Sequence, residues 1–493
     1  MPVSILLAAC YTTAMAADAS LPESLYQTHC ASCHGQERLG LTGPALLPDN
    51  LGKLKKEEAF KLIRNGRVAT QMQGFAGKLD DAQIQSLADY VFTQPDKQPD
   101  WGEADIRASR ITYPSQHPGQ DTPVFKADPL NLFLVVEAGD HHVSVLDGDS
   151  FAVIHRFPSR FSLHGGPKYD STGRFVYFTS RDGWISKFDL YRLETVAEVR
   201  AGINARNAAI SSDGKYLMVG NYLPNNLVVL DAQDLSLVKI IDATDGLGKS
   251  SRISAVYDAQ PRKSFIAALK DSPEVWEISY GDTASAGFPI RRIRLETVLD
   301  DFFFDQDYAL LLGASRKGQA QVIDLNQGKV VAKPELSGMP HLSSGIIWKY
   351  RDTNVLATPD LKEGVINILD MSTWAIIKKI KTDGPGFFMR SHENTPYAWT
   401  DVFFGEHKDV MHVIDKQSLE IVKSLRPAPG KTSSHVEFTR DGSHALVSIW
   451  EMDGAIVVYD SKTLEEVKRI PMKKPVGKYN VYNKINRSSG TSH

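Results

Sequence analysis

The pattern of apolar and polar residues divides the chain into two parts. In residues 21–94 the apolar positions recur at helical spacing, most clearly within residues 57–65 and 84–91. Asp80 or Asp81 precedes the second of these segments and is placed to cap a helix. From about Phe133 the pattern changes to short apolar runs of strand length, separated by turn residues. We therefore predict a small all-α domain followed by an all-β domain.

The β part contains eight similar units. Each has an apolar run followed by a turn and a further strand, and the runs end in aspartate, except for one that ends in serine. The runs occupy residues 143–147, 185–189, 227–231, 275–279, 320–324, 366–370, 411–415 and 456–460, at spacings of 42 to 48 residues. This period suits one four-stranded blade per repeat. It predicts an eight-bladed β-propeller, because two stacked sandwiches would not produce a constant period.

The helical part carries the sequence Cys30-Ala31-Ser32-Cys33-His34. This C-x-x-C-H pattern is the attachment site of a c-type haem, in which the two thiols bind the ring covalently and the histidine binds the iron. A zinc knuckle would need a second pair of ligands, and the chain has only three cysteines. A thioredoxin-like motif would need a βαβ context, which is absent. We predict one covalent haem held by Cys30, Cys33 and His34, in a domain with the helix order of a class I cytochrome c.

The second axial ligand of this haem is expected downstream, between two helical segments. Met72 has that position, and a thioether ligand raises the haem potential as electron transfer requires. His29 is a weaker candidate, because it directly precedes the attachment loop.

Composition and the N-terminus bound the setting of the protein. The net charge of −3 does not suggest a nucleic-acid partner. Residues 1–16 resemble an export signal that ends in Ala14-Met15-Ala16, although no Lys or Arg precedes its apolar run. We expect a periplasmic protein, with a lipid anchor on Cys10 as the second choice. The domains are then a cytochrome c domain over 17–95, a proline-rich linker over 96–125 and the propeller over 126–493.

Histidines and arginines near the starts of the inner strands are the candidate functional residues of the propeller. The histidines are His164, His341, His392 and His435, each in a different blade. A single histidine is more often structural, but four at equivalent positions predict that at least one is functional. The arginines are Arg181, Arg206 and Arg252, which are suited to clamp carboxylates of a ligand in the funnel, unless they are ordinary surface arginines.

Taken together, the chain resembles the cytochrome cd1 nitrite reductases and their paralogues. A C-x-x-C-H cytochrome joined to an eight-bladed propeller is their architecture. Several segments look like family segments: Trp101-Gly102, Ser180-Arg181-Asp182-Gly183, Phe188-Asp189-Leu190, Ala205-Arg206 and the closing 477–483. The resemblance implies that the propeller binds haem d1 non-covalently. By position, His164 matches the proximal ligand of haem d1, and His341 and His392 match the two distal histidines.

The departures from the reductase pattern point to one branch of the family. His435 stands where the reductases lack a histidine, and residues 136–140 lack an arginine that the reductases place there. The N-terminal extension before the haem loop is also short. These differences resemble the branch that acts in haem d1 biosynthesis, which oxidises one propionate side chain of dihydro-haem d1 to an acrylate.

The resemblance to that branch implies a set of roles. His164 and His435 are the expected ligands of the tetrapyrrole iron, His341 is the expected general base with His392 less certain, and the three arginines orient carboxylates. The covalent haem is expected to take up electrons one at a time. Implied partners are the tetrapyrrole substrate, a periplasmic electron acceptor, other haem d1 biosynthesis proteins and the nitrite reductase that receives the product. The alternatives are nitrite reduction, which needs an open iron position, and a non-catalytic haem d1 carrier, which would need no fused electron acceptor.

Overall fold

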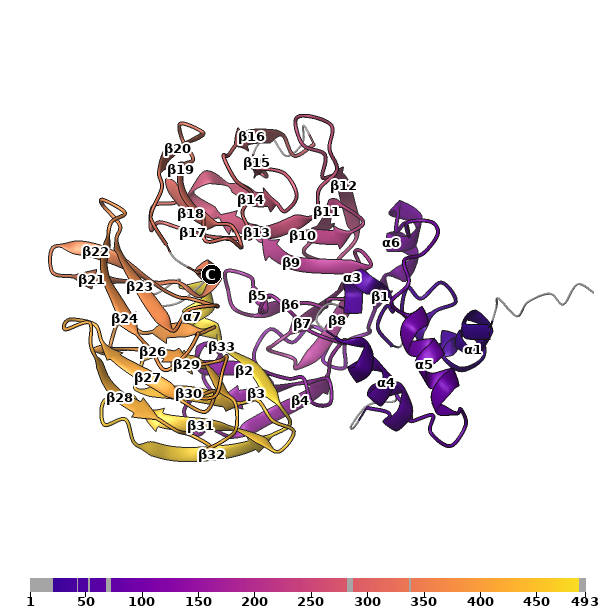
Figure 1. The fold of residues 1–493 in the computed structure, drawn as a ribbon. Helices are drawn as coiled ribbons and strands as arrows, with labels where there is room; N and C mark the ends of the chain where they lie inside the picture. Colours follow the sequence, from indigo (N-terminus) through magenta and orange to yellow (C-terminus); the bar gives the residue numbers. More distant parts are fainter. Residues whose placement is uncertain are drawn as a thin grey trace, which may run out of the picture. The chain divides into compact units, whose positions relative to one another are not determined.

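The computed structural model describes residues 21–41, 43–51, 54–67, 72–281, 287–336 and 338–486. They form two compact units, one with the described residues up to Asp96 and one that starts at Lys97 (Figure 1). The expected export signal over residues 1–16, with Cys10, lies outside the described residues. Within the described ranges, no helix has the length and apolar character needed to cross a membrane.

The first unit is helical, as predicted. Its helices are α1 (Leu21–His29), α2 (Ala31–His34), α3 (Pro48–Leu51), α4 (Lys56–Asn65) and α5 (Asp81–Tyr90). The carboxylate of Asp80 caps α5 by accepting a hydrogen bond from the Gln83 backbone N–H at 2.8 Å. Tyr26, Ile63, Ile84 and Leu87 form the centre of its buried apolar cluster. The helical periodicity of the sequence therefore corresponds to the face that each helix buries.

The described part of the second unit contains eight antiparallel sheets, which follow one another in chain order around the unit (Figure 1). From the innermost to the outermost strand, the first four are β33 (Pro475–Asn480), β2 (Leu132–Glu137), β3 (His142–Asp147), β4 (Val153–Pro158); β5 (Lys168–Tyr169), β6 (Phe175–Thr179), β7 (Trp184–Asp189), β8 (Glu194–Arg200), β1 (Ile111–Thr112); β9 (Asn204–Ile210), β10 (Tyr216–Leu223), β11 (Asn226–Asp231), β12 (Leu237–Asp242); and β13 (Ile253–Ala259), β14 (Ser264–Leu269), β15 (Glu274–Ser279), β16 (Ile290–Arg294). The other four are β17 (Asp301–Phe304), β18 (Leu310–Ala314), β19 (Ala320–Asp324), β20 (Lys329–Ala332); β21 (Ile346–Tyr350), β22 (Thr353–Pro359), β23 (Val365–Asp370), β24 (Ile376–Lys381); β25 (Met389–Ser391), β26 (Tyr397–Asp401), β27 (Met411–Asp415), β28 (Ile421–Leu425); and β29 (Ser433–Phe438), β30 (His444–Ile449), β31 (Gly454–Asp460), β32 (Glu466–Met472).

This arrangement confirms the predicted eight-bladed propeller. Each of the eight apolar runs is the third strand of a blade. The ring is closed by β33, which comes from the C-terminal end and pairs antiparallel with β2, so that Phe133 lies opposite Asn480 and Val136 opposite Gly477. Closure leaves every blade with two neighbours and removes the free ends of an open stack.

The aspartate that ends most third strands organises the following turn. In the last blade Asp460 Oδ1 accepts hydrogen bonds from the backbone N–H groups of Lys462 and Thr463 at 2.9 and 2.8 Å. Four residues after the aspartate the backbone has a positive φ, as at Leu464 with φ +62°. The same position has a positive φ in six further blades, at Phe151, Leu193, Leu235, Gly328, Trp374 and Leu419. Leu464 is 7% exposed, so its burial offsets the cost of this conformation for a residue with a Cβ.

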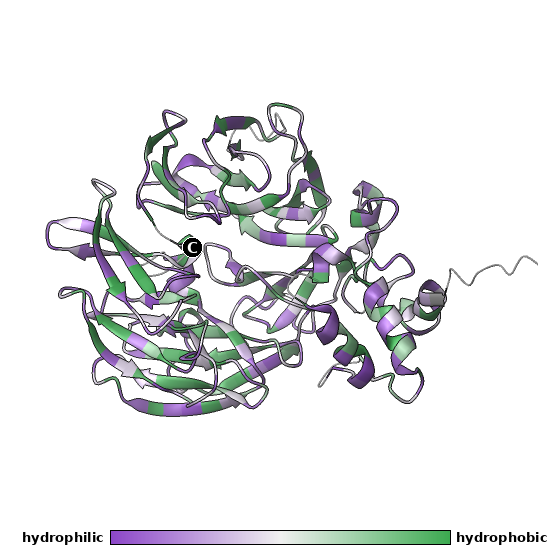
Figure 2. Ribbon diagram, in the orientation of Figure 1, coloured by the Kyte–Doolittle hydropathy of each residue, from purple (hydrophilic) through white to green (hydrophobic). Residues whose placement is uncertain are grey.

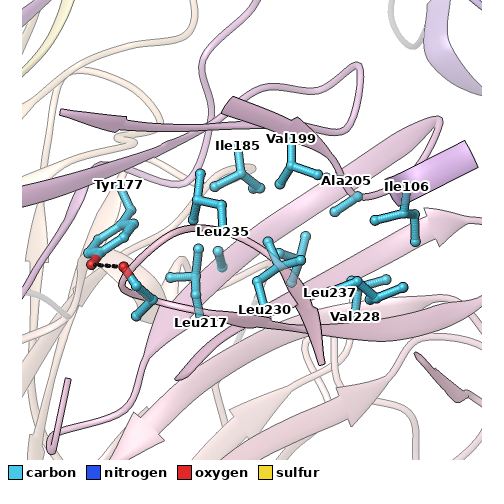
Figure 3. Close-up of a cluster of buried hydrophobic side chains, with 14 of the residues drawn as sticks. Ile106, Tyr177, Ile185, Val199, Ala205, Leu217, Val228, Leu230, Leu235 and Leu237 are labelled. Atoms are coloured by element: carbon cyan, nitrogen blue, oxygen red, sulfur yellow. Dashed lines mark hydrogen bonds between the residues drawn. The ribbon is translucent and has the colours of Figure 1, made fainter. Parts of the chain in front are cut away.

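Apolar side chains pack between neighbouring blades, and the strands carry most of the hydrophobic residues (Figure 2). In one such cluster Ile185 and Val199 of one blade meet Leu217 and Val228 of the next (Figure 3). Ile106 of α6 (Glu103–Ser109) belongs to the same cluster. These contacts make adjacent blades one continuous core.

The residues expected to form a linker, 96–125, include two elements that pack on the propeller. β1 extends the second blade by pairing with β8, and the Trp101 Nε1–H donates to the Arg200 carbonyl oxygen at 2.8 Å. Arg110 forms an ion pair with Asp234 at 2.8 Å. The proline-rich sequence therefore hides a segment that belongs to the propeller, because prolines mark turns without showing whether the chain between them is packed.

Candidate functional site

The attachment motif of the first unit spans the junction of α1 and α2. The backbone N–H groups of Cys33 and His34 donate to the Cys30 carbonyl oxygen at 3.1 and 2.9 Å, so the motif is wound into a tight turn. Both cysteines are free thiols, and burial raises the pKa of Cys30 to about 11. The two thiols are therefore available for thioether bonds, as the motif requires.

His34 is oriented for iron binding by a single hydrogen bond. Its imidazole is buried, and Nδ1 lies 2.8 Å from the Pro44 carbonyl oxygen. A carbonyl oxygen only accepts, so Nδ1 carries the proton and Nε2 keeps its lone pair. Burial also lowers the pKa of His34, which favours the neutral imidazole that binds iron. These residues fit a covalently attached haem with His34 as an axial ligand.

Met72 lies between α4 and α5, as the sequence predicts. Its side chain is half-buried and packs against the apolar cluster that also receives Cys30 and contains Phe75. The rival, His29, is the last residue of α1, and its ring lies 6.0 Å from that of Phe75. Met72 therefore remains our proposed second ligand.

The second unit contains a cavity of about 410 Å³ that collects most of the predicted residues of the propeller. Three imidazoles line it, those of His164, His341 and His435, together with the guanidinium of Arg206. His164 lies in the loop between β4 and β5, His341 just before the short 3₁₀ turn Leu342–Ser344, and His435 in the innermost strand β29. Residues separated by more than 250 positions are thus brought to one cavity by closure of the ring.

His164 is surrounded by two arginines. Its Nδ1 lies 3.0 Å from the Arg206 carbonyl oxygen, which assigns the proton to Nδ1. Nε2 therefore accepts from Arg181 Nη2 at 3.2 Å. Burial, followed by the charges of Arg181 and Arg206, holds the pKa of His164 well below its usual value. The ring is thus neutral, with Nε2 as the atom that can bind a metal.

His341 has a comparable arrangement on another blade. Its Nδ1 donates to the Phe387 carbonyl oxygen at 2.5 Å, and its Nε2 lies 3.1 Å from the Ser343 hydroxyl oxygen. Burial lowers the pKa of His341. A neutral imidazole with its Nε2 lone pair at a cavity can accept a proton at neutral pH.

His435 is 1% exposed, and neither of its ring nitrogens has a hydrogen-bond partner among the described residues. Its backbone has φ +50°, at a β-bulge between Ser434 and Val436. A buried imidazole without partners and a left-handed backbone both cost free energy, of the order of 1–3 kcal/mol each. Burial, followed by the charge of Lys478, holds the pKa of His435 well below its usual value. These features fit a ligand to an iron ion that a bound tetrapyrrole would carry.

The structure separates two predicted residues from this cavity. Arg252 forms a bidentate ion pair with Asp271, at 2.9 and 2.6 Å, and does not line the cavity. His392 is fully buried in another place, where its Nδ1 accepts from the Asn394 backbone N–H at 3.1 Å and its ring lies against Gly442. Equivalent positions in different blades therefore do not present equivalent side chains. The sequence signal was the blade position alone, and it could not distinguish these two residues from the other five.

Arg181 and Arg206 differ from Arg252 in their partners. Arg206 Nε donates to the Ser254 carbonyl oxygen at 2.8 Å, and Arg181 contacts the imidazole of His164. Neither forms an ion pair with a carboxylate within 4.0 Å in the described part of the chain. Burial, followed by the charge of Arg206, lowers the pKa of Arg181 to about 10. Two guanidinium groups beside the cavity thus have donors to offer to carboxylates of a ligand.

Sequence reasoning assigned no role to several other residues that line the cavity. Arg390 is 3% exposed, and Tyr479 and Lys484 come from the C-terminal segment that includes β33 and α7 (Val481–Ile485). Burial, followed by the charge of Arg390, lowers the pKa of Lys484 to about 7. The family-like segment 477–483 is the signal that pointed toward this region, although it did not identify individual side chains.

Comparison with protein families divides the chain in the same way as the fold. Residues 127–484 match the Cytochrome D1 heme domain, and residues 17–91 match Cytochrome C oxidase, cbb3-type, subunit III. The first match covers the propeller and its cavity, and the second covers the haem attachment motif.

Individual relatives extend over nearly the whole chain. Dihydro-heme d1 dehydrogenase of Pseudomonas aeruginosa is 56% identical over 480 residues, which are 96% of this chain and 95% of the relative. Nitrite reductase of Stutzerimonas stutzeri is 24% identical over 94% of this chain and 92% of its own. A solved structure of dihydro-heme d1 dehydrogenase NirN in complex with DHE superposes with a TM-score of 0.92, at 56% identity, and covers 94% of this chain and all of that one.

Proposed function

Because this chain belongs to the Cytochrome D1 heme domain family, together with the dihydro-heme d1 dehydrogenase to which it is similar, we propose that it is itself a dihydro-haem d1 dehydrogenase. The reaction converts the CH2–CH2 unit of a propionate side chain into the CH=CH unit of an acrylate, with loss of two protons and two electrons. One observation carries the proposal: His435 is a buried imidazole with both nitrogens unpartnered, in a cavity that also contains two further neutral histidines.

The substrate is held by histidines and arginines of the cavity. His164 and His435 are the ligands of the tetrapyrrole iron, because Nε2 of His164 has a lone pair and His435 has no other partner. Arg181 and Arg206 bind carboxylates of the substrate. Arg252 is less suited to this task, since Asp271 already occupies its guanidinium.

His341 takes one proton from the propionate side chain. The Phe387 carbonyl oxygen fixes the proton of the ring on Nδ1, so Nε2 is the accepting atom. Ser343 lies within hydrogen-bond distance of that atom and keeps the ring in place. His392 does not reach this cavity and is a weaker candidate for the base. The c-type haem held by Cys30, Cys33, His34 and Met72, once attached, supplies a one-electron acceptor.

The cellular setting is also part of the proposal. The export-like sequence over residues 1–16 and the covalent haem motif favour a periplasmic protein. Its partners are a periplasmic electron acceptor, other haem d1 biosynthesis proteins and the nitrite reductase that uses the product. The 24% identity of a nitrite reductase is consistent with a shared tetrapyrrole.

Purified protein given dihydro-haem d1 without air tests the proposal. We expect a product that has lost two hydrogen atoms, identified by mass spectrometry, and reduction of the c haem followed by its absorption. Nitric oxide from added nitrite would indicate a reductase, and tetrapyrrole binding without either reaction would indicate a carrier. Each of these two results contradicts the dehydrogenase.

A further inference from the structure

Asp401 is a buried carboxylate that faces only hydrogen-bond donors. It is the last residue of β26 and is 0% exposed. Its Oδ1 accepts from the backbone N–H groups of Phe387 and Phe388, at 2.7 and 3.0 Å. Its Oδ2 accepts from the Ser434 hydroxyl and, at 3.5 Å, from the His435 backbone N–H. One carboxylate therefore joins the loop before β25 to the bulge in β29.

The first arm of this carboxylate leads to His341. The peptide N–H of Phe387 donates to Asp401, and the carbonyl oxygen of Phe387 accepts from His341 Nδ1. The rings of Phe387 and His341 also lie against each other, with centroids 4.3 Å apart. Asp401 thus fixes the backbone that sets which nitrogen of His341 carries the proton.

The second arm leads to His435. The backbone of this residue is held at both ends, since its N–H donates to Asp401 and its carbonyl oxygen accepts from Lys478 Nζ. These bonds stabilise the left-handed conformation at φ +50° that directs the ring. The ring of Phe388, whose N–H donates to Asp401, lies 4.7 Å from the ring of His435.

We propose that Asp401 is a positioning residue that holds the base His341 and the ligand His435 in register with each other. The roles of the two histidines rest on the proposed function, but their joint attachment to Asp401 does not. Burial of a carboxylate without an ion pair is costly. Asp401 forms no ion pair within 4.0 Å in the described ranges of the chain, so its value lies in geometry, as for outer partners of metal ligands.

Two substitutions separate the arms. In Asp401→Ala both are lost, and we expect the affinity for the tetrapyrrole and kcat to fall by about 10–100-fold each, with a changed absorption spectrum of the bound tetrapyrrole. In Asp401→Asn the amide oxygen still accepts from Phe387 and Phe388, while the amide NH2 faces the His435 N–H. We therefore expect kcat to recover partly while the spectrum stays changed.

Asp245→Asn is the matched control. Asp245 is 8% exposed and accepts from two backbone N–H groups, of Leu247 and Lys249, and from the Ser272 hydroxyl, but it does not line the cavity. We expect this variant to lose stability, measured by thermal unfolding, while its spectrum and kcat remain those of the wild type.

The spectrum and affinity of the bound tetrapyrrole test Asp401 even if the wild type does not oxidise dihydro-haem d1, so failure of the proposed function is a separate result. Wild-type spectrum and affinity in both Asp401 variants would overturn the proposal. So would an Asp245→Asn variant whose spectrum changes equally. If Asp401→Ala does not fold, Asp401→Asn and Ser434→Ala, which loosens the same arm, carry the test, and unchanged spectra in both would reject it.

Discussion

Gly43 lies directly against the imidazole of His34: a Cβ built on Gly43 would lie 2.7 Å from Cε1 and 2.9 Å from Nδ1 of the ring. The glycine therefore provides the space that the ring needs to reach the Pro44 carbonyl oxygen. This relationship explains why the residue that precedes Pro44 has no side chain.

Gly43→Ala should displace the His34 ring. We expect a changed absorption spectrum of the c haem and a loss of stability of roughly 1–3 kcal/mol, the usual cost of overpacking. Gly77→Ala is the control, because a Cβ there meets nothing within 4 Å. Thermal unfolding and the spectrum of both variants measure the effect. Equal behaviour of the two variants would show that the contact does not constrain the ring.

Replacement of both attachment cysteines should abolish covalent haem. We expect the Cys30→Ala, Cys33→Ala variant to lose the haem stain on a denaturing gel, because no thiol remains in the motif. Ser32→Ala should keep the stain. A double variant that stains like the wild type would show that the haem is attached elsewhere.

Met72→His should lower the reduction potential of the c haem, since imidazole replaces a thioether ligand. A potentiometric titration followed by absorption measures the change. His29→Gln, which alters the rival candidate, should leave the potential unchanged. The reverse outcome would assign the second ligand to His29.

His435→Ala should change the absorption spectrum of bound haem d1 and weaken its binding, because a ligand bond is lost. His412→Gln is the control: His412 is 2% exposed and contacts the Ser424 hydroxyl at 2.9 Å, but it does not line the cavity. Titration of the purified variants with haem d1 measures both properties. A wild-type spectrum in His435→Ala would rule out ligation by this residue.

The pH dependence of turnover should follow His341. Because burial lowers the pKa of His341 below its usual 6.5, the ring stays neutral and able to accept a proton until the pH falls below that value. We expect kcat/KM to be constant from pH 7 down to about 6.5 and to fall below it. His341→Ala should lower kcat by about 10²–10⁴-fold and lose this acid limb.

Unfolding must be distinguished from the loss of the base. The lowered pKa values of His164, His341 and His435 mean that the unfolded chain binds protons more readily below pH 6.5, so stability also falls as the pH falls. Circular dichroism at each pH defines the range in which the fold persists. A wild-type acid limb retained in a folded His341→Ala protein would remove His341 from the mechanism.

Local sequence determined the features that depend on neighbouring residues. The C-x-x-C-H motif specifies haem attachment because two thiols and an imidazole are supplied within five residues. The aspartate after each third strand caps its own turn, as Asp460 does, so the repeat could be read as a blade. The periodicity of 57–65 and 84–91 predicted α4 and α5, because each helix buries the face on which its apolar residues recur.

Only the tertiary structure decided which side chains share the cavity. Arg252 and His392 occupy blade positions like those of Arg206 and His341, but Asp271 and the turn at Gly442 hold them elsewhere. Asp401 shows no signal in the sequence, because its role comes from three segments that meet only when β33 pairs with β2 and closes the ring. Contacts between distant segments depend on that closure, and no local pattern of residues encodes them.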